Sequence, residues 1–124
     1  MEIVKSVSEY GISVFCNVNS KSIGVCECSF IDSHLPNGVD GNYLYFNRVY
    51  VKPEYRNKGV GSKLLNVMLE LVKDLNKPIC CDINPYGDMS FEDLKLWYMK
   101  NGFNELLVEF KGYKYKQYWF NLCE

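Results

Sequence analysis

Residues 49–65 read VYVKPEYRNKGVGSKLL, and this stretch decides the fold. A Val-x-Val strand runs through a proline into a turn with two glycines, Gly59 and Gly61. Beyond Gly59, apolar residues recur at spacings of three and four as far as Leu75, which predicts an amphipathic helix. Such a turn suits anion binding, because the first N–H groups of a helix and its positive dipole end point at the ligand. Glycine lets a phosphate oxygen approach without a Cβ in the way.

The spacing distinguishes between three phosphate-binding motifs. A P-loop would need glycine at position 56 and lysine at position 62, where the chain has Arg56 and Ser62. A Rossmann fingerprint would need a third glycine at position 56 or 64 in step with Gly59 and Gly61, and position 64 is Leu64. The pattern that fits is Arg-x-x-Gly-x-Gly.

The rest of the chain predicts strands on both sides of two helices. We expect strands over 11–16, 22–31 and 43–51, the first helix, a short strand over 79–83, a second helix over 91–100, and two strands over 103–122 that divide at Lys111-Gly112. Ser90 is the predicted N-cap of the second helix, and Asn101-Gly102 is its stop. This order predicts an α/β (α+β) fold with a mixed, mostly antiparallel sheet. Only the crossover through the first helix forces a parallel pair.

Size and charge narrow the function classes. A chain of 124 residues fits one domain, so we expect residues 1–124 to fold as a single unit. The net charge of −1 gives no global positive field, which argues against dedicated nucleic-acid binding. The alternating aromatic and basic residues of 113–119 could form a stacking surface for single strands, but sheet packing is the commoner reason for this pattern.

The cysteines do not predict a metal site. The pairs Cys26-x-Cys28 and Cys80-Cys81 lack the two-residue gaps of zinc ribbons, and His34 is the only histidine. We therefore expect no metal and ordinary buried thiols. No apolar run approaches the ~18 residues that span a bilayer, and the first residues do not form a secretory signal, so a cytoplasmic location is expected.

The stretch 49–65 resembles the cofactor motif of the GNAT superfamily of acyl-CoA N-acyltransferases. Residues 96–103, LWYMKNGF, are similar to the superfamily's second signature, Leu-Tyr-x-x-x-Gly-Phe, in which the tyrosine is often the general acid. The two signatures and the strand between them cover residues 43–103 in the order and at the separation of that superfamily.

The resemblance implies acetyl-CoA as the acyl donor and assigns roles to residues. Main-chain amides would bind the pyrophosphate of coenzyme A, and the residues concerned are Arg56, Asn57, Lys58, Gly59, Val60, Gly61 and Ser62. The main chain of Val49 and Val51 would pair with the thioester carbonyl and the pantetheine arm, and the strand that ends near Asn84 would flank the other side of that arm. Tyr98 would protonate the leaving thiolate as an amine attacks directly, without a protein nucleophile.

The chain departs from the superfamily pattern at its front. The superfamily usually has one or two helices between its first strands, which shape the acceptor pocket, whereas residues 11–31 show no helical period. Phe91 and Leu94 also stand where many relatives have asparagine and alanine. The short front resembles small acetyltransferases of phages and mobile elements, some of which modify a lysine on a host or defence protein. We therefore expect an open or unusually small acceptor side.

The predicted reaction is acetyl transfer to a primary amine, either a protein lysine or N-terminus or a small amine. An open acceptor side favours a macromolecule. The general base is left open between Tyr45, Asn47, Glu27, Asp82 and a water relay. The alternative hypothesis is a non-catalytic acyl-CoA sensor or interaction module. The sequence is compatible with a homodimer and does not fix the oligomeric state.

Overall fold

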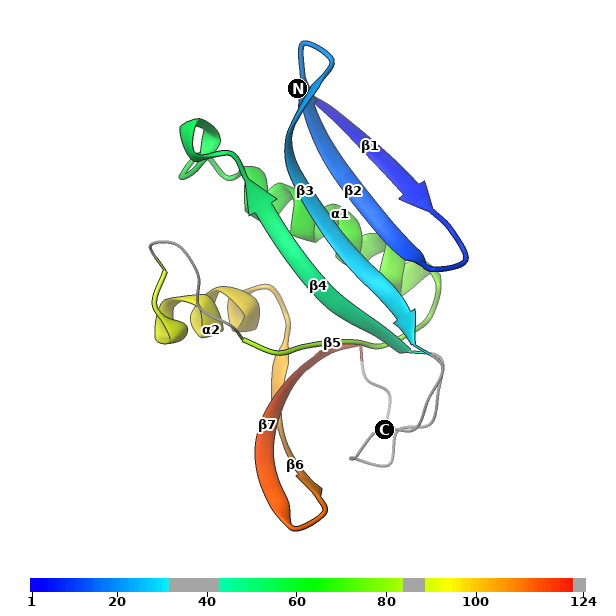
Figure 1. The fold of residues 1–124 in the computed structure, drawn as a ribbon, viewed down its shortest axis with the longest axis vertical. Helices are drawn as coiled ribbons and strands as arrows, with labels where there is room; N and C mark the ends of the chain where they lie inside the picture. The colour runs from blue at the N-terminus through cyan, green and yellow to red at the C-terminus, as the bar shows by residue number, and fades with distance from the viewer. Residues whose placement is uncertain (32–42, 84–88, 122–124) are drawn as a thin grey trace.

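The computed structural model of the chain describes residues 1–31, 43–83 and 89–121, which form a seven-stranded sheet and two α-helices. The strand order is β1-β2-β3-β4-β5-β7-β6, and every neighbouring pair is antiparallel except β4 and β5 (Figure 1). This confirms the predicted mixed, mostly antiparallel sheet. The elements are β1 Glu2–Val7, β2 Gly11–Val18, β3 Lys21–Ile31, β4 Tyr43–Val51, the 3₁₀ turn η1 Pro53–Tyr55, α1 Val60–Asp74, β5 Ile79–Cys81, α2 Phe91–Lys100, β6 Asn104–Phe110 and β7 Tyr113–Phe120.

The first three strands follow one another through hairpins. Asn19 and Ser20 connect β2 to β3 with φ angles of 51° and 64°, as in the two-residue turns whose twist matches that of paired strands. Within residues 1–31 the chain therefore passes from β1 to β3 without a helix, as expected from the missing helical period.

The sequence pattern does not predict β1. Ile3 is the only residue of this strand that is even half-buried, so the strand has no buried face to produce an alternating pattern. It joins the sheet through backbone pairing with β2, from Glu2 opposite Asn17 to Val7 opposite Ile12.

Helix α1 packs across one face of β2, β3 and β4 and forms the main core with it. Its buried stripe follows the predicted amphipathic spacing and consists of Val60, Leu64, Leu65, Met68, Leu69 and Val72. Each such side chain contributes about 1.5–3 kcal/mol on burial. Figure 1 shows α1 behind these strands, and no helix of the described residues covers their near face. We call the α1 side the inner face and the opposite side the outer face.

A β-bulge at Asn47 changes the phase of β4. Arg48 lies opposite Glu27 and Phe46 lies opposite Cys28, so Asn47 is one extra residue between them. Before the bulge, Leu44 and Phe46 face the core, and after it Val49 and Val51 do so. The bulge thereby turns both valines toward the start of α1.

Strands β4 and β5 pair over a short distance only. The parallel pairs are Leu44 with Ile79 and Tyr45 with Cys80, whereas β4 continues to Val51. The predicted strand over 79–83 is too long, since β5 ends at Cys81. Beyond Tyr45 the two strands diverge, and we call the space between them the splay. On its other edge β5 pairs with β7.

Helix α2 begins and ends at the predicted residues. The side chain of Ser90 accepts a hydrogen bond from the N–H of Asp93 at 3.2 Å, which confirms the N-cap. The chain leaves the helix through Gly102, whose φ of 97° suits glycine. Among the helices that the structure describes, none has the length and apolar character to cross a bilayer.

Candidate functional site

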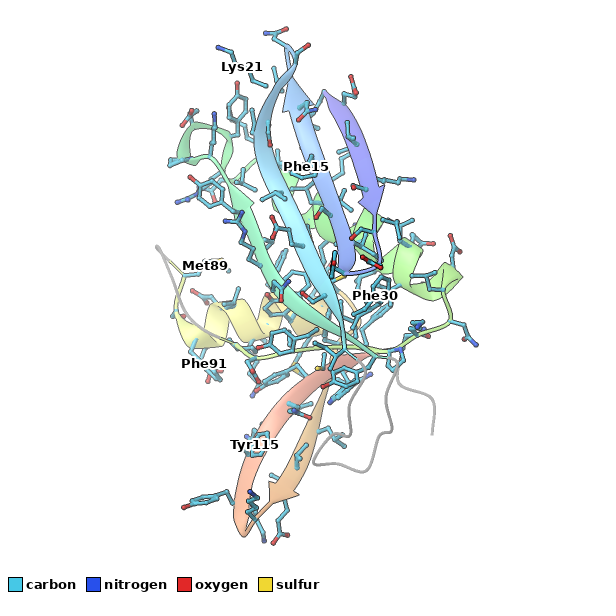
Figure 2. The ribbon with its side chains drawn as sticks, turned by 45° about the vertical axis from the view of Figure 1, so that its right-hand side comes forward. Phe15, Lys21, Phe30, Met89, Phe91 and Tyr115 are labelled. Carbon is cyan, nitrogen blue, oxygen red and sulfur yellow. The ribbon has the colours of Figure 1, made fainter. Side chains whose placement is uncertain are left out.

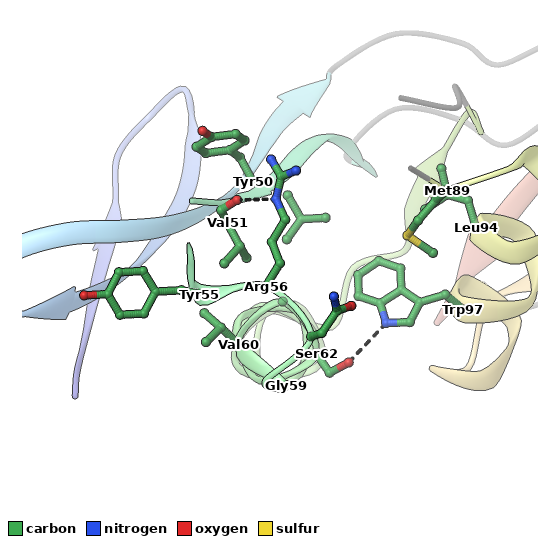
Figure 3. Close-up of a pocket in the computed structure, with 13 residues that line it drawn as sticks. Tyr50, Val51, Tyr55, Arg56, Gly59, Val60, Ser62, Met89, Leu94 and Trp97 are labelled. Atoms are coloured by element: carbon green, nitrogen blue, oxygen red, sulfur yellow. Dashed lines mark hydrogen bonds between the residues drawn. The ribbon is translucent and has the colours of Figure 1, made fainter. Parts of the chain in front are cut away.

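A cavity of about 360 Å³ opens at the N-terminal end of α1 (Figure 3). Eight residues predicted to bind the cofactor line it: Val49, Val51, Arg56, Asn57, Gly59, Val60, Gly61 and Ser62. The structure therefore brings together the strand and turn residues of the first signature. Lys58 is not part of this lining; its ammonium group lies 5.8 Å from the ring centroid of Tyr55. Asn84, the remaining predicted residue, lies outside the described residues.

The start of α1 is built to leave donors exposed. Gly59 is the N-cap with φ of 80°, a left-handed conformation that favours glycine, and its carbonyl accepts a hydrogen bond from Lys63 N–H at 3.0 Å. The N–H groups of Val60, Gly61 and Ser62 precede that bond, so they have no acceptor within the helix. These are the donors that anions use at helix N-termini.

The fold itself does not require glycine at position 61. A Cβ added to Gly61 would lie 3.8 Å from Val51 Cγ2, an ordinary contact distance. Glycine at this position therefore leaves room beside the two valines, and a diphosphate could approach the backbone there. The residues present fit the phosphates of coenzyme A on this observation.

Arg56 fixes the end of β4 at the mouth of the cavity. Its Nε donates a hydrogen bond to the carbonyl oxygen of Val51 at 2.7 Å, and its guanidinium carbon lies 5.6 Å from the ring centroid of Tyr50 (Figure 3). Lys52 N–H bonds to Ile23 in β3, so strand alternation turns the main chain of Val51 toward the splay. The Val51 carbonyl thus carries one hydrogen bond already and keeps a second lone pair.

Trp97 joins α2 to the first turn of α1, a contact that the sequence pattern did not predict. Its indole N–H donates to the Ser62 hydroxyl at 3.1 Å, and the ring lines the cavity. Met89 and Tyr55 were missed as well. The signal for Trp97 was its place next to Tyr98 in the second signature.

A second cavity of about 320 Å³ lies next to the first and is lined by Tyr98. The two cavities share Val49, Tyr50 and Leu94. Tyr98 is only 5% exposed and is surrounded by rings, with centroid distances of 5.6 Å to Phe46, 5.1 Å to Trp97 and 5.3 Å to Phe103. All three contacts are edge-on, the favoured geometry for aromatic pairs.

The four residues considered as the general base differ in whether they line the second cavity. Asn47 and Asp82 line it, whereas Glu27 and Tyr45 are absent from the lining and each bonds to a residue that lines it. Tyr45 donates to Asp82 Oδ2 at 2.7 Å, and Arg48 pairs with Glu27 at 3.2 Å. Burial, followed by the hydrogen bond to Asp82, raises the pKa of Tyr45 above its usual range.

The cysteines of the described residues lie in the core. Cys16, Cys26, Cys28, Cys80 and Cys81 are buried free thiols, as expected. Burial raises the pKa of Cys28 and of Cys80 to about 12, so these thiols stay protonated at neutral pH. Within residues 1–31, 43–83 and 89–121, no group of three metal-ligating side chains is present.

Comparison with known proteins identifies the fold. The sequence matches the family model of the acetyltransferase (GNAT) domain over residues 10–105. A GNAT-family acetyltransferase from Staphylococcus aureus Mu50 superposes with a TM-score of 0.62 at 21% identity, over 93% of this chain and 70% of that chain. PaiA N-acetyltransferase from Thermoplasma acidophilum, solved in complex with coenzyme A, gives a TM-score of 0.61 at 20% identity, over 90% and 60%.

The structure is also similar to the anti-CRISPR protein AcrVA5, with a TM-score of 0.56 at 20% identity over 85% of this chain and 96% of that chain. No curated protein gives a significant sequence match. The structural similarities establish the fold, and the family match covers well over half of the chain. It confirms the predicted class of enzyme, an acyl-CoA-dependent N-acetyltransferase with acetyl-CoA as donor. The chain belongs to the GNAT family of acetyltransferases.

Proposed function

We propose that residues 1–124 form one catalytic domain that transfers the acetyl group of acetyl-CoA directly to a primary amine. One observation carries this proposal: the cavity at the start of α1 and the cavity that contains Tyr98 lie side by side and share Val49, Tyr50 and Leu94 in their linings. We infer that the two cavities together hold the donor, with its phosphates at the cradle and its thioester near the proton donor, and we call this combined space along β4 the channel.

The donor is held by the first cavity. The N–H groups of Val60, Gly61 and Ser62 would bind the pyrophosphate, and the space above Gly61 admits its oxygens. Arg56 and Lys58 add positive charge near this end. The main chain of Val49 and Val51 borders the same channel and would pair with the arm that carries the thioester.

The acetyl-CoA thioester supplies an activated acyl carbon and a good leaving group. In the transfer, the amine nitrogen forms a bond to the carbonyl carbon and the carbon–sulfur bond breaks. Tyr98 donates its phenolic proton to the leaving sulfur, which departs as the thiol of coenzyme A. The nitrogen releases one proton through water, and this proton restores Tyr98, so the protein is unchanged after turnover.

The acceptor is best explained as an amine on a macromolecule, a lysine side chain or a chain N-terminus. The outer face of β2, β3 and β4 has no covering helix among the described residues, as Figures 1 and 2 show, so a large molecule has access to it.

The test is acetyl transfer from labelled acetyl-CoA, read by mass spectrometry. The acceptors are Nα-acetyl-lysine amide, a short lysine-free peptide with a free N-terminus, spermidine, and proteins of a whole-cell lysate. We expect the label on an amine nitrogen of at least one acceptor. Calorimetry with coenzyme A is run in parallel. No label on any acceptor would overturn the proposal, and coenzyme A binding without transfer would indicate a sensor.

A further inference from the structure

We propose that Asp82 binds the ammonium group of the acceptor and that Tyr45 positions its carboxylate for this role. The inference rests on the proposed function and adds the residue that selects a cationic acceptor. Asp82 follows β5 directly and lines the second cavity together with Tyr98.

The second cavity crosses the sheet through the splay. Phe46 and Tyr98, on one side of it, belong to the core of the inner face. Cys80, which lies opposite Tyr45, packs instead with Tyr43 and Trp119 in a separate cluster. Asp82 lies two residues beyond Cys80 and reaches the hydroxyl of Tyr45, so it belongs to this second face. The proton donor for the leaving group and the carboxylate therefore approach the channel from opposite faces of the sheet.

The charges around this cavity favour a cation. Of the residues that the structure describes, Arg48 and Asp82 are the charged ones in its lining. Arg48 is ion-paired with Glu27 at 3.2 Å, whereas Asp82 has no cationic partner within the described part of the chain. Among these described residues the carboxylate of Asp82 is thus an uncompensated charge at this end of the channel, and it attracts an ammonium group.

Tyr45 holds this carboxylate in place. Its hydroxyl donates to Oδ2 of Asp82 at 2.7 Å, and its ring packs against the cluster of Tyr43, Cys80 and Trp119. A phenol is protonated in the neutral range, and the raised pKa of Tyr45 keeps its hydroxyl a donor in mildly alkaline solution as well. A carboxylate offers about four acceptor positions, so one bond from Tyr45 orients Asp82 and leaves room for an ammonium group.

The carboxylate is suited to binding the acceptor rather than to deprotonating it. An aspartate has an ordinary pKa of about 3.9 and a lysine ammonium about 10.4, so proton transfer between them is strongly unfavourable. A charge-assisted hydrogen bond between the same groups is favourable. The amine therefore loses its proton to water, and Asp82 determines which acceptors reach the channel.

The experiment compares Asp82→Asn with Asp74→Asn, which makes the same chemical change at the exposed last residue of α1. Nα-acetyl-lysine amide, the lysine-free peptide and spermidine serve as acceptors. We expect Asp82→Asn to raise the acceptor KM about tenfold to 100-fold, the loss of one charge-assisted hydrogen bond. The KM for acetyl-CoA and the coenzyme A affinity by calorimetry are expected to stay as in the wild type. Asp74→Asn is expected to change neither KM.

Tyr45→Phe gives the second measurement, because it keeps the packed ring and removes only the hydroxyl. We expect a smaller rise of acceptor KM with kcat little changed, and no further rise when Tyr45→Phe is added to Asp82→Asn. If Asp82→Asn no longer binds coenzyme A, Tyr45→Phe decides alone. An active wild type with unchanged acceptor KM in the deciding variant overturns this inference only. A wild type inactive on all three acceptors and on lysate overturns the proposed function as well.

Discussion

Trp97 on α2 donates its indole N–H to the hydroxyl of Ser62, 3.1 Å away in the first turn of α1. These residues are 35 positions apart in the sequence and belong to the two helices that border the first cavity. An indole is a donor only, whereas a hydroxyl donates and accepts. Because the Ser62 oxygen accepts from Trp97, its own hydrogen is available to a ligand oxygen at the helix N-terminus.

Replacing Trp97 by Phe is expected to weaken coenzyme A binding about fivefold, which corresponds to the loss of one hydrogen bond of about 1 kcal/mol. The measurement is calorimetric titration with coenzyme A. Trp119→Phe is the matched control, since Trp119 also donates to a side chain, Gln117 Oε1 at 3.1 Å, and lies outside both cavities. Equal affinities in wild type and Trp97→Phe would show that the contact does not prepare Ser62.

Gly61→Ala is expected to separate binding from stability. The added methyl group would lie 3.8 Å from Val51 Cγ2, an ordinary contact distance, and alanine is the better helix former. The melting temperature is therefore expected to stay the same or rise. The methyl group would occupy the space proposed for phosphate oxygens, so we expect a loss of coenzyme A affinity of about tenfold, or about 1.4 kcal/mol. A variant that binds as tightly as the wild type would place the diphosphate elsewhere.

Tyr98→Phe is expected to lower kcat about 100-fold or more while the affinity for coenzyme A changes little, because only the proton donor is removed. The edge-on ring contacts of Tyr98 persist in the variant, so its fold is retained. Tyr118→Phe serves as the control, since Tyr118 is likewise buried but lies on β7 outside both cavities. Steady-state rates with the best acceptor provide the measurement, and an unchanged kcat would remove Tyr98 from the chemistry.

The buried thiols predict that the protein loses stability in alkali. Burial raises the pKa of Cys28 and Cys80 to about 12, whereas an unfolded thiol has a pKa of about 8.5. The free energy of unfolding is therefore independent of these two thiols below about pH 8.5. It falls as the pH rises from there toward about 12, because the thiols of the unfolded chain lose their protons first. Each thiol contributes a slope of up to about 1.4 kcal/mol per pH unit.

Urea unfolding between pH 7.5 and 10.5 measures this slope under reducing conditions. Cys80→Ala is expected to show a shallower decline than the wild type, since one of these groups is gone. Parallel declines in the two proteins would mean that Cys80 titrates alike in the folded and unfolded chains.

Most of the helices and strands could be predicted from the sequence, because short-range patterns of residues determine local structure. The stripe of α1, the Ser90 cap and the stop at Gly102 are each set by residues within one or two turns. Strand β1 has no such pattern, because its side chains are almost all exposed. Backbone pairing with β2 makes it a strand. The early end of β5 at Cys81 is likewise set by tertiary structure.

The site was predictable where its residues are consecutive. Residues 56–62 were predicted as one group because they are neighbours in the sequence, and the structure places all of them except Lys58 in the lining of the first cavity. Contacts across the fold were not predictable: Tyr45 meets Asp82 only because β4 and β5 are parallel neighbours. The sequence did not predict the β-bulge at Asn47 either. This single extra residue reverses which side chains of β4 face the core.

The brief contact between β4 and β5 has a consequence for how the molecule responds to its substrates. Only two paired residues on each of β4 and β5 join strands β1 to β4 to strands β5, β7 and β6 in the described sheet. A donor bound along β4 beyond Tyr45 would span that opening and add main-chain hydrogen bonds between the two parts of the sheet. Occupancy would then stabilise the whole protein against unfolding, so the ligand acts as a missing strand as well as a reactant.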